Sequence, residues 1–145
     1  MSLSLIFASK FISKISTAIF TGGAVYCSLV EHPARLKIDK RAAVSQFRPS
    51  LKRAILIQSL TSSIAFIGSS VAYYLENDKK WLYSAILIMS VIPYTLLCIM
   101  PINRKLTDPN LDPDSNETKH LLEKWGLLHS VRSIFGLVSL ILMEL

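Results

Sequence analysis

The stretch Ala54–Tyr74, AILIQSLTSSIAFIGSSVAYY, contains no charged side chain. Its length is that of a helix that crosses the hydrocarbon core of a bilayer, which takes about 20 residues. A helix on the surface of a soluble protein keeps charged residues along one face, and this stretch has none on any face. The stretch therefore predicts a membrane-spanning helix.

Two later stretches repeat the pattern. Trp81–Met100 contains no charged residue, and in Trp125–Met143 the only ionisable basic side chains are those of His129 and Arg132. Both stretches have the length that a bilayer requires. They predict two more membrane-spanning helices.

The first apolar stretch, Ile15–Val30, is also uncharged but is shorter than the other three. Lys10 and Lys14 can extend it if their long side chains carry the ammonium groups to the membrane surface. We therefore predict an all-α fold, a single domain over residues 1–145 that forms an integral membrane bundle of four transmembrane helices. The expected helices are at about 5–30, 52–75, 81–100 and 120–143, with loops at 31–51 and 101–119 on the same side.

Composition supports a membrane protein over the competing interpretation, a soluble all-α bundle. Hydrophobic residues make up 51% of the chain and charged residues only 18%, whereas soluble domains carry roughly 25% charged residues. The net charge of +6 is explained by loop charges, so we expect no nucleic-acid partner. Cys27 and Cys98 fall inside the expected helices and are interpreted as packing residues. The spacings typical of zinc sites, phosphate loops and dinucleotide folds are missing.

Basic residues are distributed unevenly between the two sides of the bundle. Ten Lys and Arg residues lie between residues 35 and 53 or between 104 and 119, against Lys79 and Lys80 on the other side, plus any share from Lys10 and Lys14. By the positive-inside rule the two long loops face the cytoplasm, or the matrix in a mitochondrion. Residues 1–30 resemble a mitochondrial presequence without arginine, and a first membrane helix is the interpretation we prefer. The organelle stays open between the endoplasmic reticulum and the mitochondrial inner membrane.

Local signals predict details of the loops and helices. Asp39 is a suitable cap for a short helix through Phe47, and Pro49 suits the start of the next helix. Pro93 lies in the middle of the third expected helix, where it removes a backbone donor, so a kink is expected there.

The fourth expected helix carries the most informative polar residues. Trp125, His129, Arg132 and Gly136 are spaced 4, 3 and 4 apart, which places them on one stripe about 60° wide. A charge in hydrocarbon costs several kcal/mol at least, so Arg132 must face the interior of the bundle.

Polar residues from the other helices reach the same level. We expect His32, Gln58 and Asn103 to converge with the stripe on one pocket that opens toward the loop-rich side, with Tyr26 and Tyr94 as further candidates. Histidine is the usual proton acceptor near neutral pH, and arginine or asparagine stabilises an oxyanion or enolate. The alternative is that these residues only cap helix ends or hold the helices together.

Four segments of the chain form a further pattern. They are Gly23-Ala24-Val25-Tyr26-Cys27-Ser28, Pro93-Tyr94-Thr95, Pro101-Ile102-Asn103-Arg104-Lys105-Leu106 and Trp125-Gly126-Leu127-Leu128-His129-Ser130-Val131-Arg132. The last two contain the patterns Pro-x-Asn-x-x-Leu and Trp-x-x-x-His-x-x-Arg, which are moderately specific together. These segments and their order along the chain resemble the anthrone oxygenase-like family of small four-helix membrane proteins.

The resemblance implies a membrane-embedded oxygenase that oxidises an apolar polycyclic substrate of the anthrone type with molecular oxygen and no cofactor. His129 would then be the base, with Arg132 and Asn103 stabilising the anion. Trp125 would stack on the flat substrate, with His32, Gln58 and Tyr94 as further substrate-binding residues. The alternative is a non-catalytic membrane protein, either an assembly factor or a small subunit of a larger membrane complex. A small transporter is a third interpretation, disfavoured because no repeated halves are visible.

Overall fold

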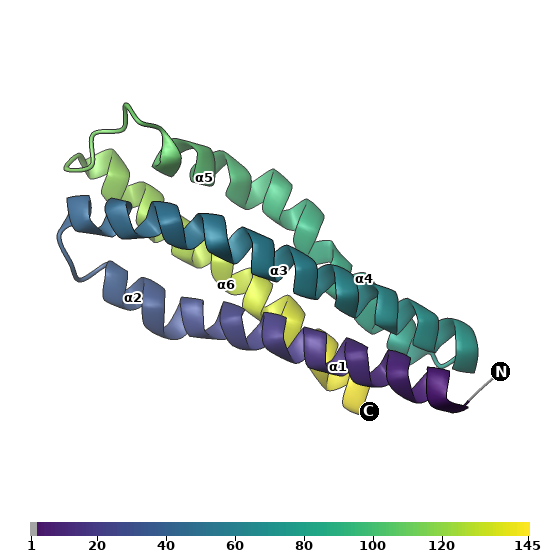
Figure 1. Ribbon diagram of the computed structural model, residues 1–145. Coiled ribbons are helices and arrows are strands. Elements are labelled where there is room, and N and C mark those ends of the chain that lie inside the picture. The colour runs from purple at the N-terminus through teal and green to yellow at the C-terminus, as the bar shows by residue number, and fades with distance from the viewer. Residues whose placement is uncertain (1–2) are drawn as a thin grey trace.

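The computed structural model describes residues 3–145, which form helices joined by short turns (Figure 1). Four of the helical segments within these residues are long and apolar enough to span a membrane, which confirms the predicted all-α fold class. The elements are α1 (Leu3–Tyr26), a π-helical turn η1 (Cys27–Glu31), α2 (His32–Arg35), α3 (Lys40–Glu76), α4 (Lys79–Tyr94), a second π-helical turn η2 (Thr95–Ile99), α5 (Met100–Thr107) and α6 (Asn116–Glu144).

The long helices form an up-and-down bundle in which each packs against two neighbours. α1 packs against α3 and α6, and α4 packs against the same two helices. The α2–α3 and α5–α6 turns lie at one end of the bundle, and both ends of the described chain lie toward the other (Figure 1). The residues around the α2–α3 turn therefore lie at the same level along the bundle as those around the α5–α6 turn (Figure 1).

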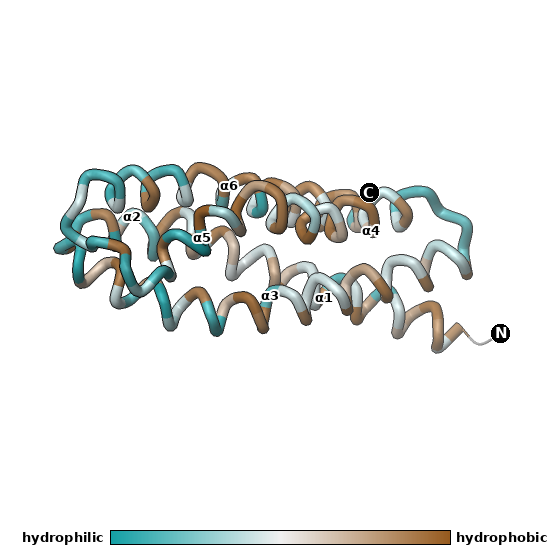
Figure 2. The backbone as a smooth tube through the Cα atoms, turned by 90° about the horizontal axis from the view of Figure 1, so that it is seen from above, coloured by the Kyte–Doolittle hydropathy of each residue, from teal (hydrophilic) through white to brown (hydrophobic). Residues whose placement is uncertain are grey.

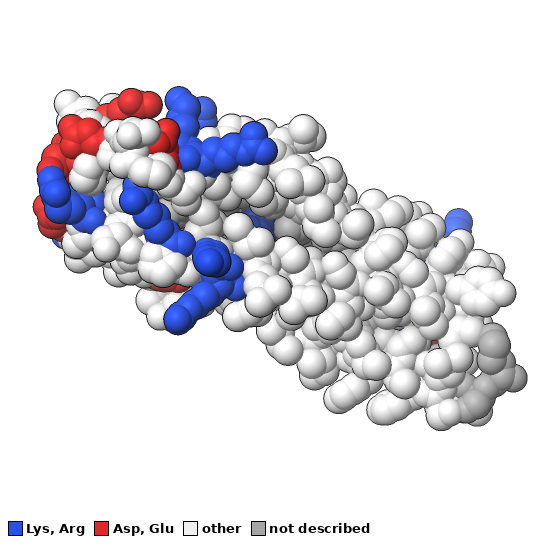
Figure 3. Space-filling model, turned by 45° about the horizontal axis from the view of Figure 1, so that its top comes forward, with Lys and Arg blue, Asp and Glu red and all other residues white. Residues whose placement is uncertain are grey.

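The helical rods are longer than a bilayer requires. The segments Leu3–Arg35 and Lys40–Glu76 contain 33 and 37 residues, and Lys79–Thr107 and Asn116–Glu144 contain 29 each. At 1.5 Å per residue they measure roughly 44–55 Å, against about 30 Å of hydrocarbon. Hydrophilic residues gather at the end with the two turns (Figure 2), where Figure 3 also shows most of the charged side chains on its face. We call this end, residues 31–53 and 102–124, the polar head.

The polar head differs from the loops expected from the sequence. Only residues 36–39 of the predicted 31–51 loop are non-helical, and α3 starts well before the expected position near 52. Asp39 caps α3 as predicted, accepting a hydrogen bond from the Ala42 backbone N–H at 3.1 Å. Pro49 lies inside α3 instead of starting a new helix. Its ring is exposed, so the carbonyl that it leaves unpaired can be solvated.

The second predicted loop, 101–119, is also shorter in the structure. α5 continues to Thr107, and the turn between it and α6 covers residues 108–115. Ser115 ends this turn as the N-cap of α6, because its hydroxyl accepts a hydrogen bond from the Thr118 N–H at 3.1 Å. The polar head is therefore a helical extension of the bundle.

The head packs around large side chains, whereas the body combines small hydroxyl side chains with two further hydrophobic clusters, around Phe20 and Trp81. A hydrophobic cluster in the head includes Phe47 and Leu106 and extends to Trp125 at its border. In the body, small hydroxyl side chains bring the helices close together, as in the 2.6 Å hydrogen bond between Ser13 of α1 and Ser69 of α3. The cavity described below lies where these two kinds of packing meet.

Candidate functional site

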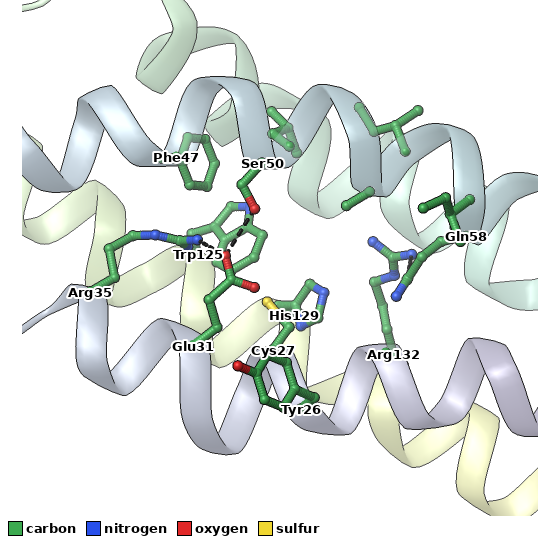
Figure 4. A pocket seen from close by; sticks show the side chains of 15 residues that line it. Tyr26, Cys27, Glu31, Arg35, Phe47, Ser50, Gln58, Trp125, His129 and Arg132 are labelled. Carbon is green, nitrogen blue, oxygen red and sulfur yellow. Dashed lines mark hydrogen bonds and ion pairs between the residues drawn. The ribbon is translucent and has the colours of Figure 1, made fainter.

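A cavity of about 240 Å³ lies between α1, α3 and α6 at the border of the polar head. We call it the Trp125 cavity. Its rim includes Tyr26, Ile55 and Ile57, which are exposed on the flanks of α1 and α3. Figure 4 looks into the cavity between these two helices. The opening is therefore sideways, instead of toward the loop-rich end as the sequence suggested. The full lining is Gly23, Tyr26, Cys27, Glu31, Arg35, Phe47, Ser50, Leu51, Ala54, Ile55, Ile57, Gln58, Trp125, His129 and Arg132.

Trp125 is held on several sides and is only 5% exposed. The His129 ring stacks on the indole, with 4.6 Å between centroids and 22° between planes. Phe47 meets it edge-on at 5.2 Å, and the Asn103 side-chain oxygen accepts a 2.8 Å hydrogen bond from the indole N–H. Because the imidazole already stacks on it, the indole is placed to orient His129 and offers little free surface to a ligand.

His129 is 4% exposed and reaches the cavity from α6. Its Nδ1 lies 3.0 Å from the Ser28 hydroxyl, which lies 3.0 Å from the Ser133 hydroxyl. If Nδ1 carries the proton and donates a hydrogen bond to the Ser28 hydroxyl, then Nε2 is the nitrogen with a free lone pair. This arrangement can accept a proton from a molecule in the cavity.

Arg132 faces the interior, as the sequence predicted, and donates a 2.5 Å hydrogen bond from Nη2 to the side-chain oxygen of Gln58 on α3. Its Nε is buried without a hydrogen-bond partner. No carboxylate forms a salt bridge with this guanidinium among residues 3–145. A buried cation without a counter-ion is costly, so this end of the cavity favours an anionic or strongly polarised oxygen.

Two matched irregularities in the helices shape the wall behind the cavity. In η1 the His32 N–H bonds to the Cys27 carbonyl, and in η2 the Met100 N–H bonds to the Thr95 carbonyl. In each case the next residue is a proline, which has no N–H to continue the regular pattern. π-helical turns of this kind re-aim side chains and are frequent at functional sites. Pro93, where the sequence predicts a kink, lies inside α4 two residues before η2 begins.

His32 follows η1 and lies behind the cavity wall, 3% exposed. Its Nε2 is 3.0 Å from the Leu122 carbonyl, so Nε2 carries a proton and donates, and Nδ1 accepts from Arg35 at 3.2 Å. The ring fits because residue 126 is glycine. A Cβ there would lie 2.5 Å from the His32 ring.

Four of the seven predicted site residues line the cavity, namely His129, Arg132, Trp125 and Gln58. The other three lie behind them. Asn103 follows η2 and bonds to Trp125, His32 bonds to α6, and the Tyr94 hydroxyl donates to the Leu128 carbonyl at 3.0 Å. These three fix α6 and its side chains in place.

A carboxylate at the other end of the cavity was not among the predicted site residues. One oxygen of Glu31 accepts from Arg35 at 2.5 Å, from Gln46 at 3.0 Å and from Ser50 at 2.9 Å. Figure 4 shows the other oxygen turned away from these donors toward Cys27. The spacing of Glu31 and Arg35, four residues apart on one helix, was the signal that could have identified the pair.

The Arg35 side chain is 2% exposed and sits 5.3 Å from the Phe47 ring and 5.8 Å from the Trp125 ring. The cavity is therefore bounded by a paired carboxylate at one end and by the unpaired guanidinium of Arg132 at the other. Among residues 3–145 no three His, Cys, Asp or Glu side chains gather as they would around a metal ion.

Comparison with known proteins identifies relatives for most of the chain. The family model described as anthrone oxygenase matches residues 47–142. An anthrone oxygenase of Claviceps purpurea is 28% identical over 143 residues, which cover 88% of this chain and 82% of that protein. An anthrone oxygenase of Aspergillus fumigatus is 34% identical over 62 residues, which cover 41% of this chain and 38% of that protein. No solved structure is significantly similar.

Proposed function

This chain belongs to the anthrone oxygenase family, and from that premise we propose that it oxidises an anthrone-type polycyclic aromatic to a quinone with molecular oxygen. The observation that carries the proposal is the unpaired guanidinium of Arg132 beside His129 in a largely apolar cavity. An apolar site with a few convergent polar groups is typical of small-molecule binding. Its volume of about 240 Å³ suits a compact, flat ligand that extends toward the open side.

We propose that the reaction takes place in a membrane. Four helices within residues 3–145 have the length and apolar composition of membrane spans, and the lateral opening between α1 and α3 would admit an apolar substrate directly from the bilayer. The polar head would face the cytoplasm or the mitochondrial matrix, because basic residues concentrate there. The lipid bilayer would then be both solvent and substrate reservoir.

Charge balance supports an anionic intermediate in this cavity. An anthrone loses a ring proton from the methylene carbon to give an enolate, whose negative charge rests on oxygen. That oxygen would supply the acceptor that the Arg132 Nε lacks and the negative charge that the guanidinium lacks. In a site with little water, such an interaction is stronger than in solution.

The proposed steps use this chain's own groups. Nε2 of His129 takes the methylene proton, and the enolate carbon forms a C–O bond with dioxygen, which gives a hydroperoxide after it gains a proton. Loss of the second hydrogen on that carbon as a proton and cleavage of the O–O bond then give the carbonyl and one molecule of water. In total, one anthrone and one dioxygen yield one anthraquinone and one water.

The remaining predicted residues take supporting roles in this proposal. Gln58 positions Arg132 by accepting its hydrogen bond. Asn103 positions Trp125, which in turn orients His129. Asn103 does not line the cavity, so we assign it to positioning in place of the anion-stabilising role suggested by the sequence.

The test is anthrone oxidation by purified protein in lipid nanodiscs. Replacing His129 with alanine should lower the oxidation rate by about 10²-fold or more, the usual effect of losing a general base. Binding of the product anthraquinone, measured by fluorescence quenching, should persist. His120→Ala is the matched control, because the His120 side chain is 79% exposed on the polar head. Full activity in His129→Ala would remove the catalytic assignment.

A further inference from the structure

A second cavity, of about 140 Å³, lies on the opposite side of α3. We call it the α3–α4 cavity. It shares Ile55, Gln58 and Arg132 with the Trp125 cavity. The hydrogen-bonded pair of Gln58 and Arg132 therefore forms a wall between the two. The lining is Ile55, Gln58, Ser59, Ser62, Val91, Ile92, Thr95, Leu96, Met100 and Arg132.

We propose that the α3–α4 cavity is a dioxygen site that supplies the Trp125 cavity from the bilayer. This inference rests on the proposed function and adds a separate route for the second substrate. The cavity is large enough for a few diatomic molecules, since one water molecule takes up about 30 Å³ of liquid. It is too small for a polycyclic ring system together with its contacts.

The position of the cavity, and its lining apart from Gln58 and Arg132, favour dioxygen over a polar ligand. Ile55, Ser59 and Leu96 at its edge are exposed on the flanks of α3 and η2, within segments that have membrane-span composition. Dioxygen dissolves better in hydrocarbon than in water, so a lateral apolar opening meets a concentrated supply. The two hydroxyl side chains nearest the interior are already engaged. Ser62 donates to the Ser59 carbonyl, and Thr95 donates to the Val91 carbonyl.

Arg132 gives the second cavity its connection to the reaction. When dioxygen bonds to the enolate carbon, negative charge moves from the substrate onto the two oxygen atoms. A guanidinium that borders both cavities lies beside the charge before and after this transfer. The hydroperoxide formed is neutral, so no new charge is left beside the hydrogen-bonded pair of Gln58 and Arg132.

Steady-state kinetics at varied oxygen pressure tests the proposal. Ser59→Phe and Leu96→Trp each add volume on the α3–α4 cavity side, and Leu97→Trp is the matched control because Leu97 is 77% exposed and does not line the cavity. The two filling variants should lower kcat/KM for dioxygen by about fivefold or more, with KM for anthrone changed by less than about twofold. Equal values in all three variants would overturn the proposal. Parallel changes for both substrates would overturn it too, because the cavity would then belong to the anthrone site.

A second measurement does not depend on turnover, so it separates this inference from the proposed function. Dioxygen is paramagnetic and accelerates the relaxation of nearby methyl groups. In protein labelled with 13C-methyl methionine, the Met100 methyl should relax faster under oxygen than that of Met143, which is buried and outside the cavity. The enhancement at Met100 should fall in Leu96→Trp and persist in Leu97→Trp. Equal enhancements at Met100 and Met143 would refute the dioxygen site, whereas a normal enhancement in a protein that oxidises no anthrone would refute only the proposed function.

Discussion

The hydrogen bond between Asn103 and Trp125 offers the sharpest test of how the site is held. Asn103 is 2% exposed and Trp125 is 5% exposed, and the indole N–H has this one acceptor at 2.8 Å. Asn103→Leu keeps the number and branching of the side-chain heavy atoms and removes the acceptor. The indole N–H is then buried and unpaired, which costs about 1–3 kcal/mol.

A double-mutant cycle separates positioning from direct chemistry. In a Trp125→Phe background there is no N–H to satisfy, so Asn103→Leu should lose little further stability or activity. The coupling free energy between the two positions should therefore be about 1–3 kcal/mol. Unfolding in detergent followed by circular dichroism gives the stability term, and anthrone oxidation gives the kinetic term. Asn110→Leu, at an exposed position in the α5–α6 turn, should change stability by only about 0.5 kcal/mol or less.

The outcome that refutes this reasoning is additivity. If Asn103→Leu lowers the oxidation rate by the same factor with Trp125 and with phenylalanine at that position, then Asn103 acts on the substrate directly. The anion-stabilising role suggested by the sequence would then replace the positioning role.

Two further substitutions probe the wall and the far end of the cavity. Gly126→Ala places a Cβ 2.5 Å from the His32 ring and should lower the unfolding free energy by about 1–3 kcal/mol. Its control is Gly22→Ala, which has open space around it and should be neutral or stabilising in the same unfolding assay. Glu31→Gln removes the charge opposite a buried guanidinium and should cost about 2 kcal/mol. Its control, Glu144→Gln, breaks an exposed ion pair and should cost less than about 1 kcal/mol. Equal losses of unfolding free energy in these two glutamine variants would contradict the structural role of Glu31.

The helices and the functional stripe could be predicted because their signals are local. Uncharged stretches long enough to cross a bilayer, such as Ala54–Tyr74, have few alternatives to a membrane span. The spacing of Trp125, His129 and Arg132 follows the helical period, so it places the three side chains on one face of a helix whatever that helix packs against. The cost of an exposed charge in hydrocarbon gave the inward direction of Arg132.

The polar head could not be predicted in the same way. Its many basic residues suggested loops, yet α3 extends through them because Phe47 and its neighbours pack into the cluster around Trp125. That cluster joins residues far apart in the chain, which a local pattern does not reveal. The π-helical turns before Pro33 and Pro101 likewise depend on how the helix continues after each proline, so the positions of His32 and Asn103 behind the cavity wall could not be foreseen.

Oxygen isotope incorporation by the purified protein tests the central claim most directly. With anthrone and 18O2 in lipid nanodiscs, the wild-type protein should consume one dioxygen for each anthraquinone formed and place one 18O atom in the new carbonyl, well above the spontaneous rate. Arg132→Gln, which removes the charge beside the enolate and keeps a polar side chain, should fall toward that spontaneous rate. If wild-type protein and Arg132→Gln both oxidise anthrone no faster than empty nanodiscs, the chain is not an anthrone oxygenase and the cavity serves another purpose.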